Sequence, residues 1–331
     1  MKKTVLSIIA AALALVIASG LCACAGGTET PKDTNGQTTN APDTNKAGGT
    51  VNTDANTTPS DTAAATAGET TSSVGSETEP EQVKGSEGLD IKNYGDTAEV
   101  RDIGTFTGTE LVIPSHVDGV PVTHIDEDAL SNDTMTSLFI PWTVTSIGED
   151  AVSSSHNLET VTFSEGLIGI GYGSFAGCPK LKTVTLPKTL ESVGQSAFRE
   201  CTALTEVTLN GNSDINNNAF CDCTALTKVT YTDDGGRAYS LKSSAFESDT
   251  ALSEARFSEG LDTIGSFCFS GCSVLGTVCL PASLTKIDAS AFYNVGSLKI
   301  LYAGSEEQWR KITVANGNEA LQSAEITYNY K

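Results

Sequence analysis

The sequence predicts a solenoid of stacked repeats, a β-rich fold of the α/β class built on a parallel sheet. A small residue followed by a large apolar residue recurs eight times, and the steps between these large residues are 22, 23, 23, 22, 26, 23 and 23 residues. A period in this range is typical of units that bury their apolar face only against their neighbours. We number the units 1 to 8 by the large residue: Leu130, Val152, Phe175, Phe198, Phe220, Phe246, Phe269 and Phe292.

Each unit contains a short alternating segment that predicts a strand. In unit 3, Leu181 is followed by Val184 and Leu186, which we expect to point inward. The intervening Thr183 and Thr185 should point outward. A proline follows the strand in several units, and proline cannot donate a hydrogen bond to a neighbouring strand.

A second extended piece and a helical segment are expected to complete each unit. In unit 3 the second piece leads to Ile170, and Gly171 permits a tight corner. The aromatic residue and the cysteine after it suit one or two helical turns on the opposite side. Unit 6 departs from the pattern, with Lys242 and Asp249 in place of glycine and cysteine, and with an insertion at 233–236 that should form a protruding loop.

The consensus I-G-x-x-A-F-x-x-C-x-x-L-x-x-V-x-L-P resembles the BspA-type leucine-rich repeats of bacterial surface proteins, over about Leu111 to Tyr302. The resemblance implies a leucine-rich repeat solenoid of about eight units of 22–26 residues, with a cap at each end. It places the repeat domain at 89–331, with an N-terminal cap at 89–113 and a C-terminal cap at 303–331. It also implies adhesion to proteins of a host or of neighbouring cells, although a fold by itself does not fix a ligand.

The first 23 residues have the composition of a lipoprotein signal peptide. A basic start leads into an uncharged, mostly apolar run that ends in Leu21-Cys22-Ala23-Cys24. This end resembles the bacterial lipobox, so Ala23 would precede the cleavage site and Cys24 would carry the lipid. The alternative is an uncleaved membrane-spanning helix, because the run is nearly long enough to cross a bilayer. We expect a lipid-anchored chain on the extracellular face of the membrane, which it would touch only through this lipid.

Residues 24–88 are predicted to form a disordered tether. Thr, Ser, Asn, Ala, Gly, Pro and Asp dominate this stretch, and it contains no aromatic residue. It cannot bury enough apolar surface to offset the entropy lost on ordering.

The charge of the chain argues against nucleic acid as a partner. The formal net charge is −21, and the region from residue 89 onward has 31 acidic and 15 basic residues, a net −16. Such a surface repels phosphate backbones, and the sequence contains no basic stripe.

No motif predicts catalysis, a metal or a cofactor. Cys178, Cys201, Cys223 and Cys272 share one repeat position, which predicts a buried column of small apolar side chains. Their state, free thiols or cross-links between adjacent units with Cys178–Cys201 as the first candidate, stays open. Cys279 takes the outward position equivalent to Thr185 and is the thiol expected to be most accessible.

The remaining candidate is the outward face of the strands, as a binding surface. The residues assigned to it are Phe139, Thr162, Thr185, Thr208, Lys228, Thr230, Glu254, Arg256 and Tyr302. We expect a non-catalytic protein that binds an extracellular or host protein there, with a glycan as a further candidate. The alternatives are an envelope assembly module, a hydrolase with a site in irregular loops, and ice binding through the threonines.

Overall fold

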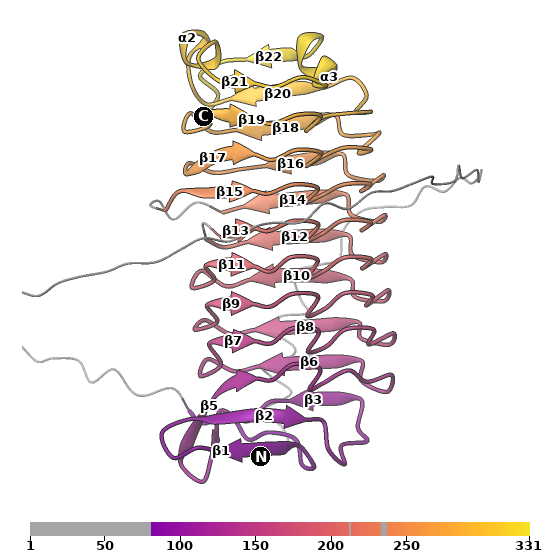
Figure 1. Cartoon of the computed structure of the whole chain (residues 1–331), viewed down its shortest axis with the longest axis vertical. Helices are drawn as coiled ribbons and strands as arrows, with labels where there is room; N and C mark the ends of the chain where they lie inside the picture. The colour runs from indigo at the N-terminus through magenta and orange to yellow at the C-terminus, as the bar shows by residue number, and fades with distance from the viewer. Residues whose placement is uncertain (1–80, 212, 233–236) are drawn as a thin grey trace, which may run out of the picture. The chain divides into compact units, whose positions relative to one another are not determined.

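The structure is a computed structural model that describes residues 81–211, 213–232 and 237–331. Its chain winds as a solenoid, and each turn adds one strand to each of two sheets (Figure 1). Sheet A consists of β1 (Asp90–Asn93), β2 (Ala98–Asp102), β4 (His116–Val117), β5 (Val120–Ile125), β7 (Ser146–Ile147), β9 (Gly169–Ile170), β11 (Ser192–Val193), β13 (Asp214–Ile215), β15 (Tyr239–Leu241), β17 (Leu261–Ile264), β19 (Lys286–Ile287) and β21 (Thr313–Val314).

Sheet B holds the longer strand of each unit. Its strands are β3 (Glu110–Val112), β6 (Ser137–Ile140), β8 (Thr160–Phe163), β10 (Thr183–Leu186), β12 (Glu206–Leu209), β14 (Lys228–Tyr231), β16 (Glu254–Arg256), β18 (Thr277–Leu280), β20 (Lys299–Tyr302) and β22 (Glu325–Thr327). Strands β6 to β20 correspond to the eight predicted units, and neighbours in sheet B pair in parallel. The predicted parallel solenoid and its second extended piece are therefore confirmed.

The alternation within each strand separates core from surface. Val184 and Leu186 of β10 are buried, whereas Thr185 between them is exposed. Val184 pairs in register with Val207 of β12, so equivalent side chains stack along the solenoid. A buried apolar column therefore runs through the interior, and it needs only the local repeat to specify it.

Phenylalanines of units 3 to 8 form a continuous stack inside the solenoid. The Phe175 and Phe198 rings are 5.1 Å apart between centroids and inclined by 5°, and Phe198 and Phe220 are again 5.1 Å apart. The stack continues through Phe246 and Phe269 with centroid distances of 5.4 and 5.6 Å. These separations suit offset stacking of aromatic rings.

The third side of each unit, which we call the turn side, was predicted to be helical, but it is not. In unit 4, Ser196 and Glu200 have φ angles of 58° and 61°, in the left-handed region that a right-handed helix cannot include. The Phe198 N–H donates to the Ala219 carbonyl of the next unit at 2.7 Å, and not to a carbonyl four residues earlier. Hydrogen bonding between units therefore replaces the expected helical turns with tight turns.

The N-terminal end begins earlier than the predicted boundary at residue 89. Strands β1 and β2 form an antiparallel pair at the end of sheet A. Preceding residues cover the edge of sheet B: the Ser86 N–H donates to the Val112 carbonyl at 2.8 Å, and the Val83 N–H donates to Ser115 Oγ at 2.8 Å. The last residues assigned to the tether thus shield an otherwise open strand edge.

The C-terminal end is closed by β21, β22 and two short helices, α2 (Glu306–Trp309) and α3 (Glu319–Gln322). Ser305 and Gln308 form a reciprocal capping box at the start of α2. The Trp309 ring packs edge-on against Tyr302 with 5.2 Å between centroids. Neither helix of the described part is long and apolar enough to span a membrane.

Several predictions concern residues outside the described part of the chain. They are the signal peptide at 1–23, lipidation at Cys24, the tether as far as residue 80, and the loop at 233–236.

The first testable prediction concerns the phenylalanine stack. Phe198 is fully buried between two parallel rings, so Phe198→Ala should leave a cavity and lower the free energy of unfolding by about 3–5 kcal/mol. Tyr293→Ala, at a residue that is 56% exposed, provides the control. Chemical denaturation of the two variants measures the difference, and equal stability of both would reject the stack as a determinant of folding.

Candidate interaction surfaces

The outer face of sheet B carries a straight column of side chains, which we call the outward column. Strand pairing places equivalent residues side by side on neighbouring strands. From β6 to β16 the column consists of Phe139, Thr162, Thr185, Thr208, Thr230 and Arg256. Thr162 and Thr185 are exposed and the others are partly exposed, so these predicted residues do share one accessible surface.

A row of charges runs beside the outward column. Glu206, Lys228 and Glu254 are register partners on β12, β14 and β16, so opposite charges alternate along this row. Arg256 pairs with Glu254 on the same strand and also donates a hydrogen bond to the Tyr330 hydroxyl at 3.4 Å. These two contacts, with Tyr330 first, raise the pKa of the Arg256 guanidinium. Lys228, Glu254 and Arg256, which were assigned to the outward face, thus lie together on β14 and β16.

Tyr302 was assigned to this face, and the structure corrects that assignment. Tyr302 is fully buried and is the register partner of Leu280, so it points into the core. Leu301 occupies the outward position instead, beside Cys279. Unit 8 is one residue shorter than unit 3 between its aromatic residue and its strand, which shifts the alternation by one.

Cys279 is also less accessible than predicted. It does lie in the outward column, between Arg256 and Leu301, but it is only 7% exposed. The Tyr330 N–H donates to the Tyr302 carbonyl at 3.1 Å, while the Tyr330 hydroxyl reaches Arg256. The Tyr330 side chain therefore extends from β20 to β16 and crosses β18, the strand that carries Cys279. Burial raises the pKa of the Cys279 thiol.

The four cysteines of the predicted column are buried, and all seven described cysteines are free thiols. Each thiol of the column donates to the carbonyl at the aromatic position of the preceding unit, as in Cys201 to Phe175 at 3.2 Å. Burial raises the pKa of Cys178 to about 12 and that of Cys201 well above its ordinary value. These thiols stay protonated at neutral pH and are poor nucleophiles.

Asp249 takes the cysteine position in unit 6 and is a buried carboxyl group. One oxygen, Oδ1, accepts the Cys223 N–H at 2.8 Å, whereas Oδ2 is buried and has no hydrogen-bond partner among the described residues. Burial raises the pKa of Asp249 well above its ordinary value. A buried carboxyl group without a countercharge favours its neutral form.

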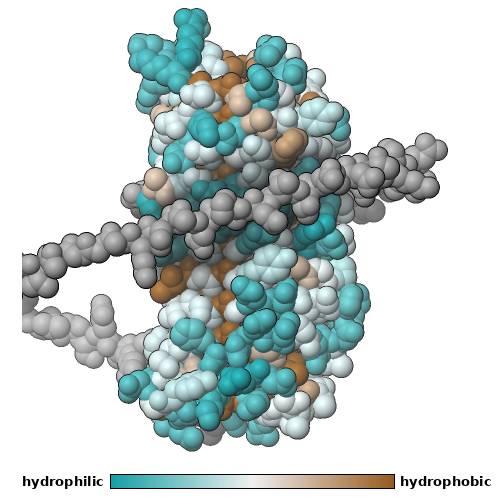
Figure 2. Space-filling view, in the orientation of Figure 1, coloured by the Kyte–Doolittle hydropathy of each residue, from teal (hydrophilic) through white to brown (hydrophobic). Residues whose placement is uncertain are grey.

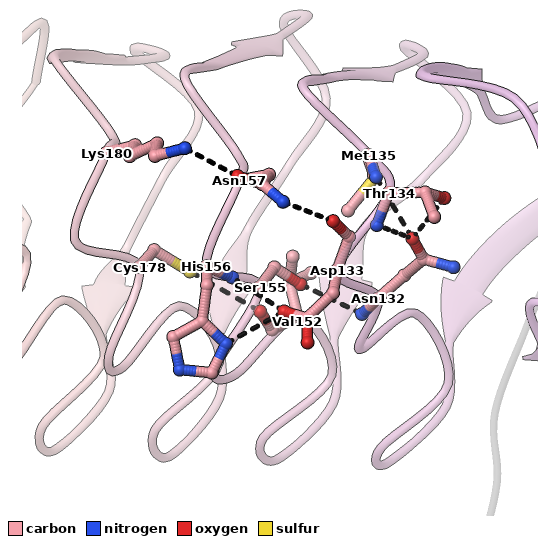
Figure 3. A network of polar contacts seen from close by, with 10 residues as sticks. All are labelled: Asn132, Asp133, Thr134, Met135, Val152, Ser155, His156, Asn157, Cys178 and Lys180. Carbon is pink, nitrogen blue, oxygen red and sulfur yellow. Dashed lines mark hydrogen bonds and ion pairs between the residues drawn. The ribbon is translucent and has the colours of Figure 1, made fainter.

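Polar side chains link units 1 to 3 at the edge of the turn side (Figure 3). Lys180 donates to Asn157 Oδ1 at 2.6 Å, and Asn157 donates to the Asp133 carbonyl at 2.5 Å. His156 Nδ1 lies 2.8 Å from Asp133 Oδ1 and lowers the pKa of that carboxyl group. Within the described ranges, no hydroxyl or thiol hydrogen bonds to the other ring nitrogen of His156, so a nucleophile for a catalytic triad is not in place there.

The turn side also contains a notch that the sequence reasoning did not identify. Its volume is about 290 Å³, and it opens across units 2 to 4. Tyr172, Arg199, Glu200 and Asp150 supply its largest side chains, and glycine, alanine and serine line the rest. The glycines around Gly171 were assigned to the repeat corner alone, and the missed indication was that Gly173, Ala176 and Gly177 all lack a long side chain in one turn.

Among the residues the structure describes, no group of three His, Cys, Asp or Glu side chains is arranged to hold a metal ion. Residues 123–237 and 239–329 match the family profile of the BspA type leucine rich repeat region, in 6 copies. The chain belongs to the BspA-type leucine-rich repeat family. The match covers more than half of the chain and includes the outward column and the notch.

Solved structures of bacterial leucine-rich repeat proteins are similar to this BspA-type chain. The T. pallidum leucine-rich repeat protein is 26% identical, covers 57% of this chain and 88% of its own, and has a TM-score of 0.50. A leucine-rich repeat protein from Bacteroides ovatus is 21% identical with a TM-score of 0.52, over 77% of this chain and 71% of its own. Among curated proteins, no sequence matches this chain. The comparisons therefore establish the repeat family and the fold.

The second testable prediction concerns Tyr330 in this BspA-type domain. Tyr330→Ala should uncover Cys279, because the tyrosine side chain spans the rung on which the thiol lies. In the folded protein a maleimide should then modify Cys279 faster than in the wild type, as measured by mass spectrometry of peptides. Tyr328→Ala, which alters the same segment at a ring that packs edge-on to Tyr302, is the control. An unchanged rate in Tyr330→Ala would show that Arg256 and Leu301 alone shield the thiol.

The third prediction concerns the pH dependence of stability at Asp249. The folded pKa of Asp249 is raised above its unfolded value, so the folded state binds the extra proton and loses stability as pH rises from about 4 towards the folded pKa. Asp249→Cys restores the repeat residue and should raise the melting temperature more at pH about 8 than at pH about 4.

The control for this prediction is Asp96→Cys, the same substitution at an exposed aspartate. Both proteins are melted in reducing buffer across the pH range. A gain in Asp249→Cys that is the same at both pH values would contradict a neutral carboxyl group in the core.

Proposed function

We propose that this chain is a non-catalytic, lipid-anchored surface protein whose repeat domain binds an extracellular or host protein through the outward column. The observation that carries the proposal is the column itself, a regular and accessible row of threonines that ends at the charged cluster of Lys228, Glu254 and Arg256. Solenoids commonly bind partners on such extended repeated surfaces.

The chemistry of this surface suits a polar protein partner. Threonine presents a methyl group and a hydroxyl group, and the neighbouring row alternates Glu206, Lys228 and Glu254. Alternating charges give register and specificity to a protein interface more than they give affinity. Figure 2 shows one face of the domain, on which hydrophilic residues predominate and the visible apolar residues lie in separate small areas. The threonines and alternating charges of the outward column fit a specific polar interface better than a broad hydrophobic one.

The proposed location rests on the N-terminal sequence. Cleavage before Cys24 and acylation of that residue would hold the domain at the extracellular face of the membrane. Two acyl chains provide stable attachment, whereas one chain alone is marginal. Attachment of cells to a partner then requires both the anchor and the outward column.

The fourth prediction tests both requirements in one attachment assay. Cells that carry the full chain are applied to immobilised host matrix and mucosal proteins. Thr185→Arg should reduce attachment because a long charged side chain projects from the middle of the outward column. Thr263→Arg makes the same change on the outer face of sheet A and should leave attachment intact.

Cys24→Ser completes the assay. It should release the chain from the cells and abolish their attachment, while the released protein still binds the same immobilised partner. Equal attachment by Thr185→Arg and wild-type cells would refute the proposed surface. A deletion that impairs envelope integrity and leaves attachment unchanged would favour an envelope assembly role instead.

A further inference from the structure

The notch on the turn side arises from a local loss of side chains. At three positions of its turn, unit 3 has Gly173, Ala176 and Gly177, whereas unit 4 has Ser196, Arg199 and Glu200 at the equivalent positions. The flanking turns therefore form two walls, and the turn of unit 3 forms the floor. Tyr172, which is 46% exposed, adjoins this floor and lines the opening.

The polar groups around the notch have unused hydrogen-bonding capacity. Within the described part of the chain, the Asp150 carboxylate, the Tyr172 hydroxyl and the hydroxyls of the lining serines make no hydrogen bond or ion pair. Asp150 Oδ1 lies only 2.1 Å from the position that a Cβ on Gly173 would occupy, so the carboxylate rests directly on the glycine floor. A side chain at Gly173 would displace it. The notch thus combines an aromatic ring, a carboxylate acceptor and hydroxyl groups that both donate and accept.

The charges in the notch exclude several ligand classes. Two carboxylates line it, and the Arg199 guanidinium is already paired with Glu200 at 3.2 Å and Asp222 at 3.5 Å. An anion would meet this negative potential as well as the net −16 of the surrounding domain. An apolar ligand would leave the carboxylate and hydroxyl groups without partners. A neutral, hydroxyl-rich ligand satisfies these groups.

The size of the notch limits the ligand to about one ring. Its volume of about 290 Å³ lies just below the range of roughly 300–1,000 Å³ for small-molecule sites. A pyranose ring presents hydroxyl groups at its edge and C–H groups on its face. The edge can hydrogen bond to Asp150 and the serines, while the face can pack against the Tyr172 ring.

We propose that the notch formed by Asp150, Tyr172 and Arg199 binds one neutral sugar residue of a glycan. This site is separate from the outward column, because the notch lies on the turn side and the column on the outer face of sheet B. The chain therefore has a second recognition surface of different chemistry. If the notch binds no sugar, the proposed function of the outward column still stands. If the outward column binds no protein, the proposal for the notch still stands.

Saturation-transfer NMR of the full chain tests the proposal directly. The probes are the methyl glycosides of galactose, mannose, glucose and N-acetylglucosamine, with the methyl glycoside of sialic acid as an anionic comparison. We expect transfer to at least one neutral probe and little to the anionic one. Transfer to none of the neutral probes, or stronger transfer to sialic acid, would overturn the proposal.

Three variants locate the binding. Tyr172→Ala should lower the affinity for the neutral probe by about tenfold, which corresponds to about 1.4 kcal/mol of binding free energy. Tyr293→Ala removes another exposed tyrosine of the turn side, 56% exposed and outside the notch, and should leave affinity unchanged. Ala176→Arg should abolish binding by filling the notch with the residue type that unit 4 already accommodates at the equivalent position.

These variants separate the notch from other surfaces. Equal affinities for Tyr172→Ala and Tyr293→Ala would place the sugar elsewhere and reject the site, as would retained binding in Ala176→Arg. Thr185→Arg should bind the sugar like the wild type. Loss of the sugar in that variant would show that the outward column, and not the notch, carries it.

Discussion

Backbone hydrogen bonding between successive units is the constraint on which the rest of this structure depends. In the sheets it fixes strand separation at about 4.8 Å. On the turn side it acts in the same way, since the Phe175 N–H donates to the Ala197 carbonyl at 2.8 Å and the Gly177 N–H donates to the Arg199 carbonyl at 2.8 Å. Every equivalent pair of side chains is therefore held at nearly one spacing. The phenylalanine rings stack at 5.1 Å between Phe175 and Phe198 because the backbone leaves them no other separation.

This spacing decides which residues the buried cysteine column can contain. A side chain in that column must be small and must donate to the carbonyl of the preceding unit, as the Cys223 thiol does to the Phe198 carbonyl at 3.2 Å. At the C-terminal end of the solenoid, Asn318 takes the position of Ser174 in a neighbouring column, and its amide donates to the Asp288 and Ala315 carbonyls as the Ser174 hydroxyl donates to those of Gly148 and Gly171. Asp249 in the cysteine column donates to no carbonyl of the described part of the chain, because Oδ1 accepts the Cys223 N–H and Oδ2 has no partner. The column thus explains both the repeated cysteine and the cost of departing from it.

The fold could be predicted because each unit repeats the same inward and outward positions, and Val184 and Phe198 lie as their spacing indicated. The prediction failed where a decisive contact was non-local or a repeat was incomplete. Ile300, Leu301 and Tyr302 are all apolar, so no alternation marked the register of unit 8. Cys279 has an outward position, but Tyr330, 51 residues further along the chain, spans its rung. Left-handed residues such as Ser196 and Glu200 are not glycine, so the turns were not recognisable from composition.

The candidate surfaces follow from the same constraint, in two opposite ways. Where the repeat is kept, as from Thr185 to Thr230, regular spacing turns one side chain into an extended surface of equivalent groups. Where substitution breaks the repeat, one turn keeps its backbone and loses its side chains. This loss opens a hollow, and the turns of the two neighbouring units form its rigid walls. Gly173 and Gly177 have this effect because the hydrogen bonds to the next unit persist without their side chains. A solenoid can therefore acquire a small, preorganised site by deletion of side chains alone, at no cost to the stack that supports it.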